Sequence, residues 1–400
     1  TGQLFSPHLQ IMIGQLFKMF ENLFTLSYLS IVAPSRAQSA PRDAPFAPRT
    51  PRPRATYYFQ PHRGPTMRTA EIIDATEAKR LLLGGGTRFL CASSDAALGD
   101  AVERARDGAS DGSDANGSSA KDAFDDARVP GAVFYDHDAV CDLSSPLPRA
   151  FPTRTTFART CGAVLGVRAN DDVVIYARDA KDYAAHYAAH VFVEYAHRGR
   201  VCVLEGGFEG WVASGGELEL GTENVREYAS VKYDDGESMR GGHDDDVKSG
   251  IIDAMDALVN LSTQRLQILD CRRREVFEGM ARDSTRLRIQ GRVISFDGFR
   301  EGHIPGAKNV PYDALFDVRN GDLEKVFVDA GLDLSMPVAV VGTGGVDASP
   351  MVAFALRRAG CTALVVRNGM AAWCTAQGGS YPMSVANSSP HASHNEKRLI

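Results

Sequence analysis

From Thr69 onward, short runs of apolar residues alternate with stretches whose sequence is compatible with helices. The clearest helical stretches cover residues 184–195 and 351–359. The candidate buried strands, each followed by a glycine-containing or polar turn, cover residues 88–91, 173–176, 201–204, 266–269, 338–341 and 363–366. Short apolar strands that alternate with helices are typical of parallel sheets, because a helix carries the chain back over the sheet between parallel strands. The pattern therefore predicts an α/β fold in which open parallel sheets carry helices on both faces.

One series of motifs occurs twice along this pattern. Pro-Gly-Ala occurs at residues 130–132 and again at 305–307, and an apolar run followed by a Gly-containing turn and a Trp occurs at 203–211 and again at 365–373. The only two Trp residues of the chain, Trp211 and Trp373, occupy the same place in each copy. An internal repeat of this length indicates two homologous domains. We therefore predict tandem α/β domains over residues 69–222 and 248–384.

Four segments do not follow the pattern. Residues 106–126 are rich in Asp, Ser, Gly and Ala, which predicts a solvated acidic insertion in the first domain. Residues 223–247 are acidic and contain glycine, as an interdomain linker would be. Residues 385–400 form a polar tail, which we expect to be flexible. Residues 1–68 precede the predicted domains and are expected to be disordered or to carry a targeting signal.

The composition of residues 1–68 leaves their role open. The apolar stretch at 22–35 is shorter than the roughly 20 residues that cross a bilayer, so we expect no membrane span. It could be the core of a signal peptide, whereas the Arg-rich segment that follows resembles a mitochondrial or plastid transit peptide. A third interpretation is an upstream extension, with translation starting at Met67 and the protein remaining cytoplasmic.

Charge and cysteine content exclude several classes of function. Residues 34–68 contain seven Arg and one acid, so the chain from Thr69 onward carries a charge of about −12 within a total of −6. A body this acidic would repel polyphosphates, which disfavours nucleic-acid binding. The seven Cys form no Cys-x-x-Cys pair, so neither a zinc ribbon nor a redox dithiol is predicted. His186 and His190 have no evident third ligand, and we expect no metal and no cofactor.

The motifs, taken in order, resemble those of rhodanese-like sulfurtransferases, specifically the two-domain thiosulfate and 3-mercaptopyruvate sulfurtransferases. The resemblance spans about residues 69–384. It is carried by residues 130–138, 148–152 and 203–211 in the first half, and by 270–272, 302–311 and 365–373 in the second.

The resemblance implies sulfur transfer from thiosulfate or 3-mercaptopyruvate to cyanide or a thiol. In this family the first domain is catalytically silent, and a Cys in the second domain carries the sulfur as a persulfide. That Cys begins a loop between a strand and a helix, where backbone N–H groups lower its pKa. The implied partners are a small sulfur-containing anion and a thiol acceptor, which can be a protein.

The sequence departs from the family at this loop. Counting from Pro337 places Gly342 at the position of the nucleophilic Cys, and the alternative alignment, shifted by one residue, places Val341 there. The loop residues that would contact substrate are Thr343, Gly344, Gly345 and Val346. They are joined by Arg272, the one anion-binding side chain that matches the family. Cys271 is the candidate replacement thiol, although strand alternation predicts that it points into the core.

Asp347 is a second departure, because the mercaptopyruvate enzymes have Thr at its position. A carboxylate at ~6 Å would oppose a bound anion by about 3 kcal/mol at an effective dielectric constant of 20. Two hypotheses follow. The chain is a sulfurtransferase that uses another thiol, or it is a catalytically silent rhodanese module that binds an anion or a partner.

Overall fold

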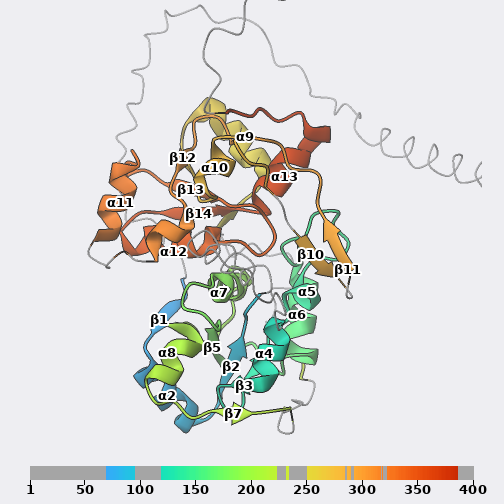
Figure 1. Ribbon diagram of the computed structural model, residues 1–400, viewed down its shortest axis with the longest axis vertical. Coiled ribbons are helices and arrows are strands. Elements are labelled where there is room, and N and C mark those ends of the chain that lie inside the picture. Colours follow the sequence, from blue (N-terminus) through green and yellow to red (C-terminus); the bar gives the residue numbers. More distant parts are fainter. Residues whose placement is uncertain are drawn as a thin grey trace, which may run out of the picture. The chain divides into compact units, whose positions relative to one another are not determined.

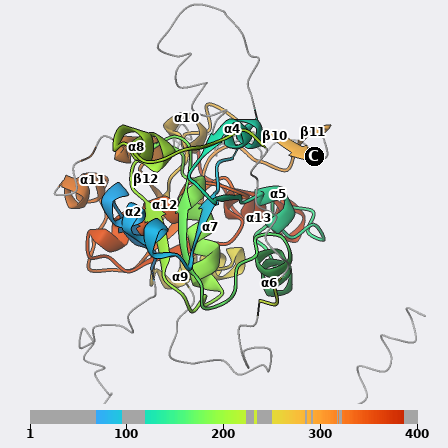
Figure 2. The same ribbon diagram turned by 90° about the horizontal axis from the view of Figure 1, so that it is seen from below.

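The computed structural model describes residues 69–94, 119–222, 231–233, 250–283, 286–289, 292–316, 318 and 322–385. The predicted segment 1–68, the predicted tail 385–400 except Val385, most of the linker and most of the predicted insertion lie outside these residues. Figures 1 and 2 show the described part in two views related by a 90° turn.

The first half of the chain forms a five-stranded parallel sheet with the strand order β1-β6-β5-β2-β4. Its strands are β1 (Glu71–Ile73), β2 (Thr87–Cys91), β4 (Val133–Phe134), β5 (Asp172–Tyr176) and β6 (Val201–Leu204). Its helices are α2 (Ala75–Gly84), α4 (Ala120–Asp126), α5 (His137–Val140), α6 (Arg154–Ala163), α7 (Ala184–Glu194) and α8 (Gly207–Ala213). The strands β3 (Ala127–Arg128) and β7 (Glu219–Leu220) form a separate, short antiparallel pair.

The second half repeats this topology. Its parallel sheet has the order β12-β9-β13-β14-β8. Counted from the other edge, β8, β14, β13, β9 and β12 correspond to β1, β6, β5, β2 and β4 of the first sheet. Its strands are β8 (Ile251–Ile252), β9 (Gln267–Asp270), β12 (Lys308–Asn309), β13 (Val338–Val341) and β14 (Ala363–Val366). Its helices are α9 (Ala254–Thr263), α10 (Arg274–Phe277), η2 (Tyr312–Leu315), α11 (Leu323–Asp329), α12 (Ser349–Arg358), α13 (Gly369–Thr375) and η4 (Ala376–Gly379). A hairpin of β10 (Arg286–Ile289) and β11 (Arg292–Ser295) follows α10.

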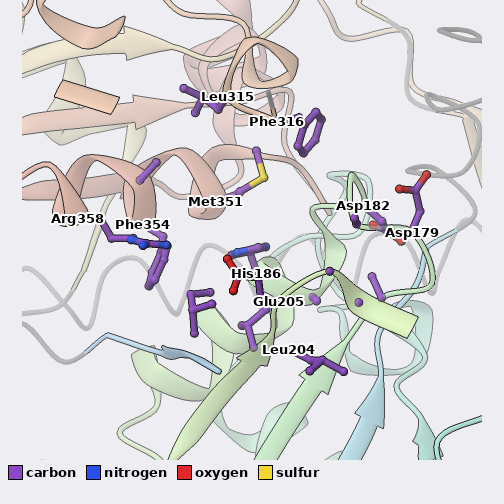
Figure 3. A pocket seen from close by; sticks show the side chains of 18 of the residues that line it. Asp179, Asp182, His186, Leu204, Glu205, Leu315, Phe316, Met351, Phe354 and Arg358 are labelled. Atoms are coloured by element: carbon purple, nitrogen blue, oxygen red, sulfur yellow. The ribbon is translucent and has the colours of Figure 1, made fainter. Parts of the chain in front are cut away.

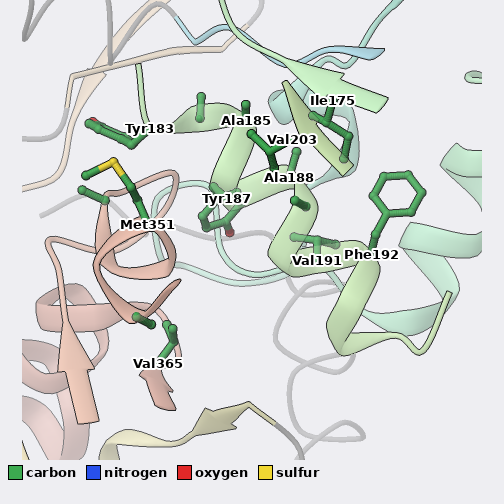
Figure 4. Close-up of a cluster of buried hydrophobic side chains, with 14 of the residues drawn as sticks. Ile175, Tyr183, Ala185, Tyr187, Ala188, Val191, Phe192, Val203, Met351 and Val365 are labelled. Carbon is green, nitrogen blue, oxygen red and sulfur yellow. The ribbon is translucent and has the colours of Figure 1, made fainter. Parts of the chain in front are cut away.

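Three clusters of buried apolar side chains hold these layers together. One lies between the first sheet and helices α2, α4 and α8 and contains Trp211. Another lies between the second sheet and helices α9 and α13 and contains Trp373. The third and largest is continuous across both halves, where helix α7 packs against helix α12 (Figure 4). Each sheet therefore has helices on both faces, and the predicted fold class is confirmed.

The structure differs from the sequence prediction at the end of the supposed insertion. Residues 120–126 form helix α4 instead of a solvated segment, because Ser119 and Asp122 make a reciprocal capping box. The helix is anchored by Phe124, which is buried and packs on Phe134. Ala120 is buried as well, so a capping box and two buried apolar side chains hold this polar stretch as a helix. Among all the described residues, no helix has the length and apolar character needed to cross a bilayer.

Candidate functional site

The loop of interest joins β13 to α12 and covers residues 342–348. Strand β13 is fully buried and lies in the middle of the second sheet, paired with β9 and β14. Its carboxyl end is therefore flanked by the carboxyl ends of two parallel neighbours. In open α/β sheets this edge is where ligands bind, because loops from several strands meet there.

Gly342 begins this loop, and the space beside it is filled by Asp347. A β-carbon at position 342 would lie 2.6 Å from both Cγ and Oδ1 of Asp347. Real β-carbons do not come this close to other heavy atoms, so any side chain at position 342 requires the carboxylate to move. The carboxylate of Asp347 thus occupies the volume that a nucleophilic side chain would need.

Asp347 is held by three hydrogen bonds from its own loop and helix. The backbone N–H of Gly344 donates to Oδ2 at 2.7 Å, while the backbone N–H and hydroxyl of Ser349 donate to Oδ1 at 2.8 and 2.5 Å. Burial raises the pKa of Asp347 above its usual range, and these hydrogen bonds act in the opposite direction. Donors that could hold a bound anion are therefore satisfied by a carboxylate from within the chain.

The other predicted loop residues surround this carboxylate. Gly344 and Gly345 both have positive φ, 108° and 77°, which lets the loop turn tightly. A β-carbon at Gly345 would lie 2.9 Å from the carbonyl oxygen of Pro148, so the loop closely approaches a segment of the first half. Val346 is buried in the core cluster shared by both halves. The predicted residues 343–346 are thus brought together, but around Asp347.

Thr343 and Arg272 are linked through a residue that sequence reasoning missed. The Thr343 hydroxyl donates to Oδ2 of Asp283 at 2.9 Å, and Nη1 of Arg272 lies 3.5 Å from the same oxygen. Burial raises the pKa of Asp283, and the charge of Arg272 partly offsets this. No motif singles out this Asp, since it follows α10 outside the segments that carry the family resemblance.

Arg272 is 4% exposed and its donors are engaged in internal contacts. Its guanidinium binds the carboxylate of Asp270 through Nε and Nη2, and Nη2 also donates to the carbonyl oxygen of Gly302 at 2.8 Å. A buried Arg with a paired carboxylate has little charge left for a ligand. Its predicted role in binding an anion remains a prediction, and the geometry favours a structural role.

Comparison with known proteins identifies the family. The family model described as the rhodanese-like domain matches residues 106–214 and 253–376, which together cover more than half of the chain. The chain belongs to the rhodanese-like family. The two matches correspond to the two halves of the tandem repeat.

The similar proteins of known name are sulfurtransferases. The chain is 30% identical over 246 residues to 3-mercaptopyruvate sulfurtransferase of Mus musculus, which covers 59% of this chain and 73% of that protein. It is 28% identical to thiosulfate/3-mercaptopyruvate sulfurtransferase 1, mitochondrial, of Arabidopsis thaliana, over 61% of this chain and 64% of that protein.

Solved structures agree on the fold. The structure of the 3-mercaptopyruvate sulfurtransferase SseA from Escherichia coli matches with a TM-score of 0.54 at 22% identity, covering 74% of this chain and 98% of SseA. The Tum1 protein from Saccharomyces cerevisiae matches with a TM-score of 0.62 at 19% identity, over 80% and 99% of the two chains.

None of the cysteines of this rhodanese-like chain has the environment of an activated thiol. All seven lie within the described residues, and all are buried and unbridged. Burial raises the pKa of each of them above its ordinary value. A reactive Cys needs the opposite, a lowered pKa and partial exposure, because the thiolate is the nucleophile.

Cys271 was the candidate replacement nucleophile. Its side chain belongs to the large core cluster and is 2% exposed, which confirms that strand alternation directs it inward. Burial raises its pKa well above the ordinary range, and the nearby carboxylates of Asp347 and Asp270 add to this effect. A role for Cys271 as a nucleophile is therefore disfavoured by both access and electrostatics.

His186 and His190 lie on helix α7, as predicted, and both rings contact aromatic side chains. The ring of His186 packs near Phe354 and that of His190 near Phe151. Among the described residues, no group of three His, Cys, Asp or Glu side chains could hold a metal ion.

Proposed function

We propose that this chain is a catalytically silent rhodanese module, one that keeps the sulfurtransferase fold but does not carry sulfur itself, and that it acts by binding a partner. Its relatives include enzymes named 3-mercaptopyruvate and thiosulfate sulfurtransferase. For this chain, the same activity would mean moving sulfane sulfur from thiosulfate or 3-mercaptopyruvate to cyanide or a thiol.

The observation that carries the proposal is the pairing of Gly342 with Asp347. In the family's reaction a thiolate at position 342 would take the sulfane sulfur, releasing sulfite or pyruvate, and would then pass that sulfur to cyanide or a thiol. Gly342 has no atom that can accept the sulfur. In addition, Asp347 occupies the space for the missing side chain and accepts the N–H of Gly344.

The same geometry bears on what the module binds. An anion in the loop would meet the carboxylate of Asp347. A second carboxylate, that of Asp283, accepts a hydrogen bond from the hydroxyl of Thr343 in the same loop. Like charges at such distances oppose binding, by several kcal/mol where solvent is excluded. A protein partner, of the thiol acceptor class that the family implies, is therefore favoured over a free sulfur-containing anion.

The test is a pair of assays on the purified full chain. Thiocyanate formation from thiosulfate and cyanide, and pyruvate release from 3-mercaptopyruvate, are measured against the Escherichia coli 3-mercaptopyruvate sulfurtransferase as a positive control. We expect the rates with the chain to equal those without protein. Turnover above that background, under conditions where the control is active, would contradict the proposal.

An organelle is the proposed location. The Arg-rich, acid-poor composition of residues 34–68 supports a transit segment, and one relative is named as mitochondrial. A fusion of residues 1–68 to a fluorescent protein should accumulate in mitochondria or plastids. A diffuse cytoplasmic signal, equal to that of a fusion that carries only residues 67–68, would contradict the organelle proposal.

A further inference from the structure

The first half of the chain contains a loop equivalent to residues 342–348. It covers residues 177–183 and joins β5 to α7. In each loop, the carbonyl oxygen of the first residue accepts a hydrogen bond from a backbone N–H of the helix that follows the next strand. Phe208 N–H donates to the carbonyl oxygen of Ala177 at 2.7 Å, and Met370 N–H donates to that of Gly342 at 2.9 Å. Position 177 therefore corresponds to position 342.

The first loop borders a cavity. We name it the α7–α12 pocket, because these two helices form much of its wall; its volume is about 260 Å³. The first half contributes Asp179, Asp182, His186 and Glu205, and the second half contributes residues of η2, α11 and α12. In Figure 3, Asp179 and Asp182 are drawn at one end of the pocket and Arg358 at the other, with His186 between them.

The polar lining of this pocket is mainly acidic. Asp179, Asp182 and Glu205 supply three carboxylates, whereas Arg358 is the one Lys or Arg among the lining residues. A cleft lined by an excess of one charge attracts ligands of the opposite sign, because its low-dielectric walls concentrate the field. The charge of the pocket therefore points to a cation.

His186 supplies a second, independent sign of a ligand. Its Nδ1 atom is buried and makes no hydrogen bond within the described residues. A buried polar atom without a partner costs about 1–3 kcal/mol, so such atoms are uncommon unless a water or a ligand satisfies them. Burial lowers the pKa of His186 to about 4, so the ring is neutral at physiological pH and adds no positive charge.

The rest of the lining is apolar. Leu315, Phe316, Met351 and Phe354 form the wall contributed by the second half. Small-molecule sites typically combine such apolar walls with a few convergent polar groups. A bare metal ion fits poorly, because no cluster of His, Cys, Asp and Glu in the described part of the chain has metal-binding geometry.

We infer that the α7–α12 pocket binds a small organic cation, an ammonium or guanidinium group carried on an apolar body. The carboxylates of Asp179 and Asp182 meet the cation, His186 offers one further hydrogen bond, and the body packs on Met351 and Phe354. This site is separate from the loop at 342–348, and the inference holds whether or not the chain transfers sulfur.

Calorimetric titration of the full chain with three probes of equal size tests the inference. The probes are phenethylamine, phenylacetate and phenethyl alcohol, which carry one aromatic body with a positive, a negative or no charge. We expect phenethylamine to bind at least about tenfold more tightly than phenylacetate, since one hydrogen-bonded charge is worth about a factor of ten or more. Equal binding of the amine and the acid, or no binding of the amine, would overturn it.

Two matched variants locate the binding site. Asp179→Asn and Asp136→Asn remove the same charge from two Asp residues that each accept the N–H two residues further on, at 2.7 and 2.9 Å, but only Asp179 lines the pocket. Asp179→Asn should weaken phenethylamine binding about tenfold, and Asp136→Asn should leave it unchanged. Equal effects of the two would overturn the assignment. If Asp179→Asn does not fold, the exposed Glu205→Gln replaces it, with the same expected weakening.

A third variant fills the pocket without changing its charge. Ala355→Leu enlarges a partly buried side chain on α12 that lines the cavity. Its circular dichroism should match that of the unaltered chain, and phenethylamine binding should be lost. Unchanged binding by this folded variant would show that the amine binds elsewhere.

Discussion

The two equivalent loops of this chain share one arrangement and differ in one respect. In each loop an Asp lies six residues after the last residue of the preceding strand and accepts the N–H two residues further on. Ala184 N–H donates to Asp182 and Ser349 N–H donates to Asp347, both at 2.8 Å. The loop at 342–348 is therefore built like the loop in the half that the family resemblance marks as silent.

The difference lies at the first position of each loop. Position 177 is Ala and position 342 is Gly, and in the second loop the Asp347 carboxylate lies over that position and accepts a further N–H, from Gly344. The second loop is closed around its own carboxylate, and the first borders the α7–α12 pocket. A side chain at position 342 and the carboxylate of Asp347 would use the same volume, so in this loop each excludes the other.

The largest expected effect is the restoration of chemistry to the second loop. Gly342→Cys alone should form no persulfide, because its β-carbon would meet the Asp347 carboxylate and the thiolate would be repelled by it. The double variant Gly342→Cys/Asp347→Thr frees the volume and removes the charge, so persulfide formation from thiosulfate should become measurable. Equal rescue by the single variant would show that Asp347 does not block the loop.

The Trp residues test whether the two halves are equally well packed. Trp211 and Trp373 are almost completely buried and donate to the carbonyl oxygens of Glu217 and Pro382. Trp211→Ala and Trp373→Ala should each lower the free energy of unfolding of the chain by about 3–5 kcal/mol. Urea denaturation measures this, with the exposed Leu143→Ala as the control. A loss below about 1 kcal/mol in one half would break the comparison.

A pair of glycines tests how each loop is held to the following helix. Gly207 and Gly369 have positive φ, and a β-carbon on either would collide with the carbonyl oxygen of Ala177 or Gly342. Gly207→Ala and Gly369→Ala should each cost about 2–3 kcal/mol of stability, from backbone strain and collision together. Gly215→Ala is the matched control, since Gly215 has positive φ but open space around it. Equal losses in all three would exclude the collision.

The smallest expected effect is the pH dependence of stability that comes from His190, a buried residue of the first half. Burial lowers the pKa of His190 to about 3, and the charges of Arg357 and Arg367 contribute. Because the unfolded chain takes up this proton near pH 6.5, His190 costs stability as pH falls from about 6.5 towards 3, by about 1.4 kcal/mol per pH unit. His190→Leu should reduce the slope of unfolding free energy against pH between 6 and 5 by about 1 kcal/mol per pH unit. The buried His137 and His186, whose pKa values are also lowered, keep the rest of the slope. An unchanged slope would show that His190 is protonated without cost.

Much of the fold could be predicted because its signals are local. All six predicted strands are present within a residue of their expected ends, since buried parallel strands are continuous apolar runs. The edge strands β1, β4, β8 and β12 are two or three residues long and give no such signal. Helix α4 was missed because its two buried residues, Ala120 and Phe124, lie in a polar stretch.

The sequence predicted which residues form the loop after β13, but it did not predict the contacts that these residues make. The strand and the repeat located residues 342–346, and the sequence showed that no thiol follows β13. That Asp347 would turn into its own loop depends on the absence of a side chain at Gly342, a three-dimensional relation. The shared position of Asp182 and Asp347, six residues after each strand, was the available signal. Asp283 had none, since its contacts with Thr343 and Arg272 bridge segments far apart in sequence.

The central claim is that no side chain of this chain accepts sulfane sulfur, and mass spectrometry tests it most directly. The purified full chain is treated with thiosulfate or 3-mercaptopyruvate under native conditions, and each cysteine-containing peptide is examined for an added sulfur atom. We predict that all seven cysteines remain unmodified. A persulfide on Cys271 or on any other cysteine would contradict this account.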